Sequence, residues 1–326
     1  MRNLVAAAEA TSGPSPLVPR LTVDEVAALG ERLRANVRAG VHLPESVLDV
    51  VVATLLAGGH LLVEDHPGLG KTQLARTLAS SLAGRFSRVQ ATVDLLPSDI
   101  LGASIWRPNT ATFEFRAGPV FANVVLVDEL NRATPKTQSG LLEAMQERQV
   151  SIDGETRPLP APFMVIATQN PSAGYDGTYP LPPAQLDRFL ARVSLGYPTA
   201  EQELTLLSGG PTEVAPVSSP RELLAAQWAV ATVHASESLL SYLVNLVTAT
   251  REHPLIEVGA SPRAGLLLLA AARARAAVHT RAFAVPDDVQ AMATAVLRHR
   301  LQLAPAAGAG AADQVIADVL AQVPAR

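Results

Sequence analysis

The sequence predicts an α/β protein in which a parallel sheet flanked by helices is followed by an all-helical domain. Three observations lead to this prediction. A short apolar run, residues 61–64, passes through a Gly/Pro-rich turn into an amphipathic segment that begins at Lys71. Two more apolar runs, residues 124–127 and 163–168, end in polar side chains, as buried strands of a parallel sheet do. From Thr199 onward the pattern is helical.

These patterns divide the chain of 326 residues into four parts. Residues 1–20, in which prolines alternate with small residues, are expected to be disordered. Residues 21–198 form the α/β domain and residues 199–303 the helical domain, with the boundary near Pro198. Residues 304–326 are expected to be a flexible link and a short C-terminal helix. A chain of this length most often makes about two domains.

Composition and charge narrow the class of protein. The net charge of −4 argues against a nucleic-acid motor, because binding to a phosphate backbone normally requires a basic excess. The chain has no cysteine, which excludes disulfides and Cys-ligated metals. The N-terminal apolar run is too short for a signal peptide, and no run approaches the about 18 apolar residues of a membrane span. We therefore expect a soluble cytoplasmic protein.

The first elements are two helices. Thr22 and Glu25 have the spacing of a capping box, which predicts a helix that begins at Val23. A second helix follows Pro44 and ends at residues 58–59, a pair of glycines. It leads the chain into the apolar run at residues 61–64.

That run, the turn and the next helix predict a phosphate-binding loop. Backbone N–H groups of such a loop point at an anion, Lys71 can reach the β- and γ-phosphates, and the Thr72 hydroxyl can hold Mg²⁺. Asp65 stands where the G-x-x-x-x-G-K-[ST] pattern has glycine, so its carboxylate must point away from phosphate or cap a backbone N–H. For the loop taken alone, a Gly-rich structural turn is the alternative. The predicted nucleotide-binding residues are Asp65, His66, Pro67, Gly68, Leu69, Gly70, Lys71, Thr72 and Gln73.

Two carboxylates follow the apolar run at residues 124–127. Ligands of parallel α/β sheets lie beyond the carboxyl ends of the strands, where Asp128 and Glu129 stand. We expect Asp128, with Thr72, to hold Mg²⁺, and Glu129 to polarise the attacking water. The alternative is that the acidic pair belongs to the N-cap region of the helix that begins at Thr134-Pro135.

Several further segments are candidates for function. Asn170 follows the strand at residues 163–168, and its amide can bond the γ-phosphate or the lytic water; alternatively it caps a turn before Pro171. Residues 101–117 and 150–156 predict hairpins, which are either ordinary surface hairpins or insertions that touch a partner. Arg188 is either a salt-bridge partner or an Arg finger that acts on another subunit.

The helical domain has clear helix starts. Ser and Thr residues stand at the N-cap positions of successive amphipathic segments, at Thr199, Ser219, Ser236 and Ser261. Pro286 begins the last core helix. No metal-ligand cluster is evident in the sequence.

Together these motifs resemble the MoxR family of AAA+ ATPases over about residues 41–303. Five ordered motifs at sensible spacing are far more specific than any single one. They are the Walker A region at 58–72, the Walker B segment at 127–138, sensor 1 with its loop at 167–171 and 177–182, the Arg-finger segment at 187–189, and the sensor 2 helix start at 259–264.

The resemblance implies a P-loop AAA+ core with a helical lid, in a protein that hydrolyses ATP with Mg²⁺ and assembles as a hexameric ring. Arg188 would enter the neighbouring subunit's site, and Arg263 would report the nucleotide state to the lid. The implied activity is chaperone-like remodelling, assembly or metal-cofactor insertion in a client, such as one with a von Willebrand factor A domain. Residues 41–44 depart from the family's Gly-Gln-containing entry, which leaves the adenine-side contacts open.

Three other functions use related folds. A nucleic-acid motor or loader would show hydrolysis stimulated by DNA or RNA. An ATPase subunit of a metal chelatase would respond to a tetrapyrrole-chelating partner. A non-enzymatic nucleotide-gated scaffold is disfavoured because Glu129 and Arg188 are both present.

Overall fold

The computed structural model describes residues 20–66, 68–170, 177–209, 213–308 and 310–325. The expected disorder of residues 1–20, apart from Arg20, and the expected phosphate contact of Pro67 lie outside the described residues.

The core is a five-stranded sheet in the order β2-β5-β8-β1-β9, and every neighbouring pair is parallel. Because all strands run the same way, their carboxyl ends meet at one edge of the sheet and their amino ends at the other. The strands are β1 (Leu61–Glu64), β2 (Phe86–Gln90), β5 (Val124–Asp128), β8 (Met164–Gln169) and β9 (Ala191–Val193).

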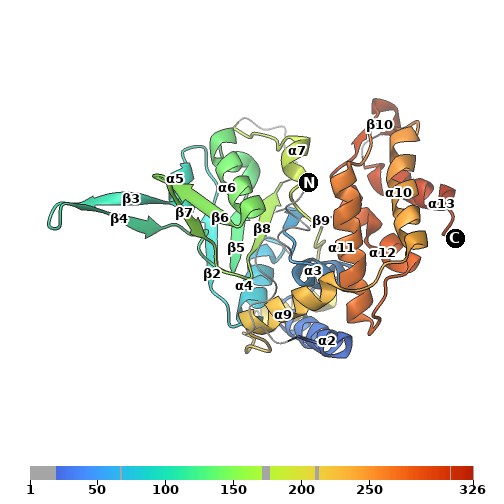
Figure 1. Ribbon diagram of the computed structural model, residues 1–326, viewed down its shortest axis with the longest axis horizontal. Helices are drawn as coiled ribbons and strands as arrows, with labels where there is room; N and C mark the ends of the chain where they lie inside the picture. Colours follow the sequence, from blue (N-terminus) through green and yellow to red (C-terminus); the bar gives the residue numbers. More distant parts are fainter. Residues whose placement is uncertain (1–19, 67, 171–176, 210–212, 309, 326) are drawn as a thin grey trace.

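Helices cover both faces of this sheet, which gives three layers (Figure 1). Successive side chains of a strand point to opposite faces. Leu61 and Val63 accordingly join one hydrophobic cluster, and Leu62 joins the other. The first cluster includes α2 (Val23–Gly40), α3 (Glu45–Leu56) and α4 (Lys71–Ser81); the second includes α6 (Pro135–Glu147). The predicted α/β class is confirmed.

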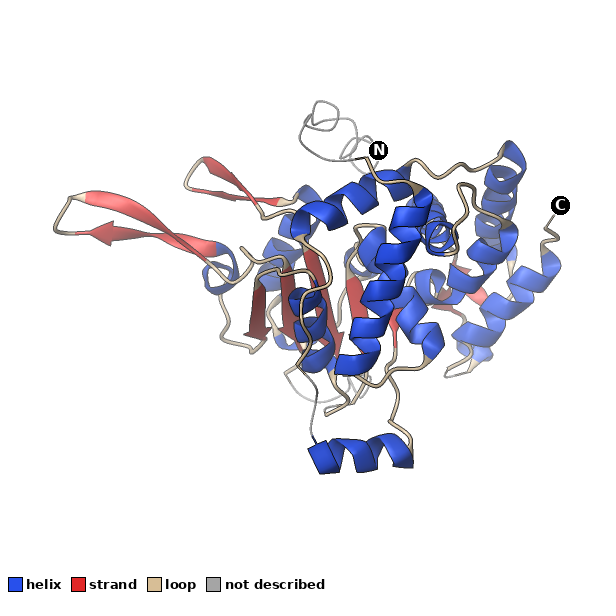
Figure 2. Ribbon diagram, turned by 90° about the horizontal axis from the view of Figure 1, so that it is seen from below, coloured by secondary structure: helices blue, strands red, loops and turns tan. Residues whose placement is uncertain are grey.

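The predicted helix starts and hairpins are present. Thr22 and Glu25 make the reciprocal hydrogen bonds of a capping box at α2. Figures 1 and 2 show two hairpins that project from the body on the same side. One joins β3 (Gly102–Arg107) to β4 (Thr112–Ala117), and the other joins β6 (Gln149–Ile152) to β7 (Glu155–Pro158). Short helical turns lie between these elements: α5 (Pro97–Leu101), η1 (Leu130–Arg132) and α7 (Pro183–Leu186).

The rest of the chain is mainly helical, as predicted, but it also contains a short antiparallel pair, β10 (Ile256–Val258) with β11 (Gln302–Leu303). Within the hydrophobic cluster that α2 and α3 share, α11 (Pro262–Val278) packs against both of these helices. The other elements are α8 (Ala200–Gly209), α9 (Pro220–Ala231), α10 (Glu237–Glu252), α11 (Pro262–Val278), α12 (Pro286–Leu297), η2 (Pro305–Ala307) and α13 (Ala312–Gln322).

Candidate functional site

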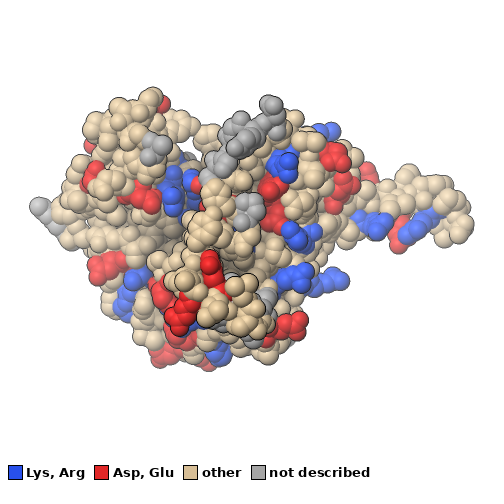
Figure 3. All heavy atoms as spheres, turned by 180° about the vertical axis from the view of Figure 1, so that it is seen from behind, with Lys and Arg blue, Asp and Glu red and all other residues tan. Residues whose placement is uncertain are grey.

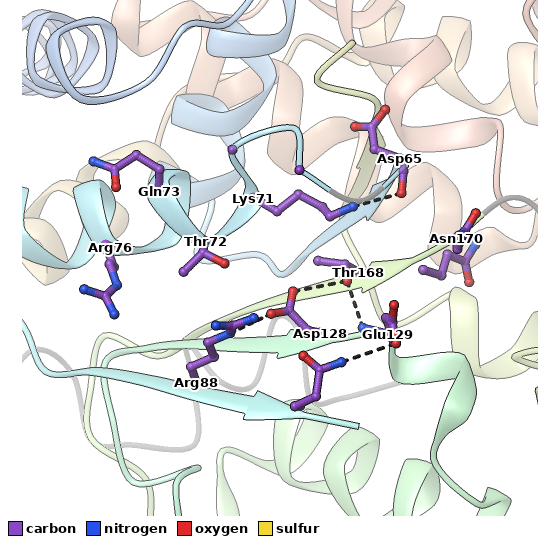
Figure 4. A pocket seen from close by; sticks show the side chains of 14 residues that line it. Asp65, Lys71, Thr72, Gln73, Arg76, Arg88, Asp128, Glu129, Thr168 and Asn170 are labelled. Atoms are coloured by element: carbon purple, nitrogen blue, oxygen red, sulfur yellow. Dashed lines mark hydrogen bonds and ion pairs between the residues drawn. The ribbon is translucent and has the colours of Figure 1, made fainter. Parts of the chain in front are cut away.

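A cavity of about 560 Å³ opens at the carboxyl edge of the sheet. It collects side chains from the start of α4 and from the ends of β2, β5 and β8, which are far apart in the sequence (Figure 4). We call it the carboxyl-edge cavity. Its lining residues are Asp65, Gly68, Gly70, Lys71, Thr72, Gln73, Arg76, Arg88, Gln90, Asp128, Glu129, Thr168, Gln169 and Asn170.

The loop before α4 is shaped to receive an anion. Gly68 and Gly70 have φ of 89° and 82°, in the left-handed region that glycine adopts without strain. Gly70 is the N-cap of α4 and supplies no side-chain hydrogen bond, so the first-turn N–H groups have no side-chain cap. A helix N-terminus in this arrangement attracts phosphate through its N–H groups and its dipole.

Asp65 lines the cavity, but its carboxylate is directed away from the loop. The Ser194 hydroxyl donates to Oδ1 at 2.7 Å, and the backbone N–H of Leu195 donates to Oδ2. The carboxylate thus points away from the phosphate-binding loop and accepts from a backbone N–H, as the sequence predicts for an aspartate at this position. The residue ties the end of β1 to the segment that follows β9.

Lys71 lies across the mouth of the loop. Its Nζ donates to the backbone oxygens of Asp65 and His66, at 2.8 Å each. Partial burial lowers the pKa of Lys71, although the nearby carboxylates of Asp65, Asp128 and Glu129 act in the opposite direction. His66 therefore contributes a carbonyl to Lys71, and neither His66 nor Leu69 lines the cavity.

Asp128 is the last residue of β5 and is almost buried. Its Oδ2 accepts from Arg88 Nε at 2.7 Å, and its Oδ1 accepts from the Thr168 hydroxyl at 3.4 Å (Figure 4). Both carboxylate oxygens thus have partners within the protein.

Glu129 follows at a bend in the chain. Its φ of 54° lies in the left-handed region, which is strained for a residue other than glycine and is found preferentially at functional sites. Its backbone N–H donates to the Thr168 hydroxyl at 2.9 Å. Its Oε2 accepts from Arg132 at 2.9 Å and from Gln90 at 3.3 Å. The bend gives Glu129 a place in the cavity wall beside Asp128.

Sequence reasoning missed five residues of this cavity: Arg76, Arg88, Gln90, Thr168 and Gln169. A weak signal existed for two of them. Arg88 and Gln90 alternate along β2, so they share one face of that strand, and they stand near its carboxyl end.

The other two predicted site residues, Arg188 and Arg263, do not line this cavity. They lie together in a second cavity of about 1130 Å³, at the amino edge of the sheet. Its wall includes residues that directly precede strands, such as His60 before β1 and Leu190 before β9. We call it the amino-edge cavity.

The two edges are well separated. A strand rises about 3.3 Å per residue, so a five-residue strand such as β5 separates them by roughly 15 Å. Arg263 Nε lies 4.0 Å from Asp187 Oδ2, and Arg300 donates to Asp187 Oδ1 at 2.7 Å. Burial lowers the pKa of Arg188, and the positive charge of Arg263 lowers it further.

The donor atoms of the carboxyl-edge cavity fit Mg²⁺ held together with a phosphate. Among the described residues, no group of three or more His, Asp or Glu could hold a metal by itself. Thr72 and Asp128, however, offer two oxygen donors in one cavity. Mg²⁺ is usually held by one or two protein oxygens, with substrate phosphates and water completing its octahedral shell.

Within the part of the chain that the structure describes, no helix has the length and apolar character needed to span a membrane.

Comparisons with known proteins agree with this geometry. The family model described as "ATPase family associated with various cellular activities (AAA)" matches residues 60–191, and the AAA lid domain model matches residues 248–319. A crystal structure from Cytophaga hutchinsonii has a TM-score of 0.84 and 36% identity, over 93% of this chain and 97% of that one.

Several named relatives align with this chain over most of their own length. Chaperone MoxR1 of Mycobacterium tuberculosis is 43% identical over 79% of this chain and 72% of its own. Protein MoxR of Paracoccus denitrificans is 31% identical over 79% of this chain and 84% of its own. The uncharacterized protein YeaC of Bacillus subtilis is 49% identical over 78% of this chain and 81% of its own. This chain therefore belongs to the MoxR family of AAA+ ATPases.

Proposed function

We propose that this protein binds Mg·ATP in the carboxyl-edge cavity, hydrolyses it, and uses the cycle to remodel a client protein. One observation carries the proposal. Five predicted site residues from three separate parts of the chain line one cavity at the carboxyl edge of the sheet: Lys71, Thr72, Asp128, Glu129 and Asn170.

Each residue has a role that its position supports. Lys71 and the N-terminus of α4 bind the phosphates, and Thr72 and Asp128 hold the metal. The bound cation would neutralise negative charge on the phosphates. Glu129 polarises the attacking water, and Asn170 orients it or bonds the γ-phosphate. Catalysis then depends on positioning and electrostatics, as is general for phosphoryl transfer.

Arg188 acts on a neighbouring subunit in this proposal. Because Arg263 lies in the same cavity, we propose that the nucleotide whose state it reports to its lid is also the neighbour's. Both arginines lie at the amino edge, roughly 15 Å from the carboxyl-edge cavity of their own chain. In a head-to-tail ring, the amino edge of one subunit meets the carboxyl edge of the next; such interfaces form a ring when the rotation between subunits closes. A hexamer, the assembly that the resemblance implies, would give every nucleotide two arginines from its neighbour.

The client role rests on the relative named Chaperone MoxR1 and on the β3–β4 hairpin. Trp106 and Phe113 stack edge to face on this hairpin with ring centroids 5.1 Å apart, and they are 48% and 71% exposed. An exposed aromatic pair on a projecting hairpin is suited to contact another protein. We propose that it conveys nucleotide-driven movement to a client, including one with a von Willebrand factor A domain, during assembly or metal-cofactor insertion.

Surface charge favours a protein client over a nucleic acid. The chain carries a net charge of −4, and on the face shown in Figure 3 acidic and basic side chains are intermixed. A nucleic-acid motor would instead show hydrolysis stimulated by DNA or RNA, with a steep dependence on salt.

The test is Glu129→Gln, which keeps the size of the side chain and removes its charge. We expect ATP binding to persist while hydrolysis falls roughly 10²–10⁴-fold, because the group that polarises water is lost. Glu114→Gln, on the exposed β4 strand, is the matched control and should hydrolyse ATP normally. A Glu129→Gln protein that turns over ATP at the normal rate would remove Glu129 from this role.

A further inference from the structure

The contact between Arg88 and Asp128 has no role in the function proposed above. Arg88 Nε donates to Asp128 Oδ2 at 2.7 Å, within an ion pair. The carboxylate is mostly buried, with its side chain 10% exposed, whereas the Arg88 side chain is 49% exposed. A charge-assisted hydrogen bond of this length is stronger than one between neutral groups.

The sheet places Arg88 beside Asp128. β2 is the edge strand next to β5, and their parallel register pairs Gln90 with Asp128. Arg88 and Gln90 are two residues apart, so both side chains lie on the same face of β2. Arg88 reaches Asp128, and Gln90 reaches Glu129.

Asp128 is also the predicted metal ligand, so the guanidinium and a cation compete for one carboxylate. Oδ2 bonds Arg88, while Oδ1 accepts from Thr168. Mg²⁺ demands near-ideal octahedral geometry and strong oxygen donors. A positively charged group bonded to one of those donors both occupies its lone pair and repels a second cation.

We propose that Arg88 is a latch on Asp128: it holds the carboxylate in the nucleotide-free protein and releases it when Mg²⁺ enters with ATP. The latch raises the Mg²⁺ concentration at which nucleotide binds. It rests on the proposed function, because it presupposes that Asp128 serves the metal. Since half of the Arg88 side chain is exposed, it can leave Asp128 without opening the hydrophobic core.

Arg76 provides the matched control. It lines the same cavity, but its guanidinium lies over the Phe86 ring, 5.6 Å from the centroid. Each of the variants Arg88→Ala and Arg76→Ala removes one positive charge from the cavity wall. Arg88→Ala also removes the contact with Asp128 that we propose as the latch. The difference between the two variants therefore isolates the latch from the general effect of charge.

The experiment titrates Mg²⁺ against the full-length protein with a fluorescent ATP analogue and measures binding rather than turnover. We expect the half-saturating Mg²⁺ concentration of Arg88→Ala to be roughly fivefold lower than that of Arg76→Ala, the scale of a partly exposed ion pair. Equal values for the two variants, or a higher value for Arg88→Ala, would overturn the latch.

Two further measurements keep the outcomes separate. If Arg88→Ala melts well below the wild type, Arg88→Lys is used in its place. The lysine keeps the positive charge but lacks the Nε donor that bonds Asp128. We expect it, too, to lower the half-saturating Mg²⁺ concentration. If wild-type protein binds the analogue equally with Mg²⁺ and with EDTA, the metal does not contribute to nucleotide binding, and the proposed binding of Mg·ATP fails together with the latch. If wild-type binding requires Mg²⁺ but the variants match Arg76→Ala, the latch alone fails.

Discussion

At the carboxyl edge of the sheet, Lys71 shares its cavity with the carboxylates of Asp128 and Glu129, whereas at the amino edge Arg188 and Arg263 share theirs with Asp187. Asp187 is also engaged by Arg300, so its charge is divided among several cations. The amino edge thus has an excess of positive charge next to apolar side chains such as Trp228 and Leu266.

Under the proposed function, one parallel sheet supplies two halves of a catalytic site that do not meet within a chain. In this proposal, the groups that bind phosphate and polarise water lie at the carboxyl edge, and the groups that stabilise negative charge lie at the amino edge. A second copy is the simplest way to bring an amino edge to a carboxyl edge.

The largest expected effect on the hydrolysis rate comes from removing Arg188 at the amino edge. Arg188→Ala should bind ATP normally but lose roughly 10³–10⁵ in hydrolysis rate, the range typical of Arg fingers. Mixing it with Glu129→Gln should restore part of the activity, since an intact carboxyl edge then meets an intact Arg188. If the mixture is as inactive as its components, Arg188 does not act across an interface.

Removing the amine at the carboxyl edge should affect binding instead. Lys71→Ala deletes a charge-assisted contact to phosphate, and we expect affinity for an ATP analogue to fall roughly 10- to 100-fold by fluorescence titration. Arg188→Ala measured in parallel should bind within about twofold of wild type at low protein concentration, where subunits are dissociated. Equal losses in both variants would erase the distinction between the two edges.

The smallest effect concerns His60, a structural residue of the amino edge. The Val165 N–H donates to Nδ1 at 3.0 Å, so the ring proton is on Nε2, which donates to the Met145 carbonyl at 3.1 Å. Burial lowers the pKa of His60 to about 3, and the positive charge of Arg148 adds to this. The folded protein therefore excludes a proton that the unfolded chain accepts below pH of about 6.5.

The free energy of unfolding of the protein should therefore fall as the pH drops from about 6.5 toward 3. His60 contributes up to about 1.4 kcal/mol per pH unit to this fall. Urea unfolding at several pH values measures the slope. A His60→Gln variant lacks the titrating ring, so its slope should be shallower over this window, whatever its stability at neutral pH. An identical slope in the variant would contradict a neutral, buried His60.

Local signals predicted much of the carboxyl edge. Gly70-Lys71-Thr72 and Asp128-Glu129 are contiguous motifs whose geometry follows from the strand or helix that they adjoin, so no long-range information was needed. The continuous apolar runs identified β5 and β8 for the same reason. The short β10 and β11, of three and two residues, gave no periodicity to detect.

Arg88 and Thr168 were missed because their roles depend on strand register. In the sequence, Arg88 is a charged residue in an edge strand with exposed positions, a pattern common on protein surfaces. Only the pairing of β2 with β5 brings it to Asp128. The joining of Arg188 and Arg263 likewise depends on how α11 packs at the amino edge, which no local pattern encodes.

The aspartate at position 65 has one more consequence. Its two hydrogen bonds, to Ser194 and to the N–H of Leu195, attach the first residue of the phosphate loop to the stretch that leaves the sheet for the helices. Glycine, which the loop pattern has at this position, offers no such tether. The position of the loop is therefore coupled to Leu195, three residues before Pro198, through a single side chain.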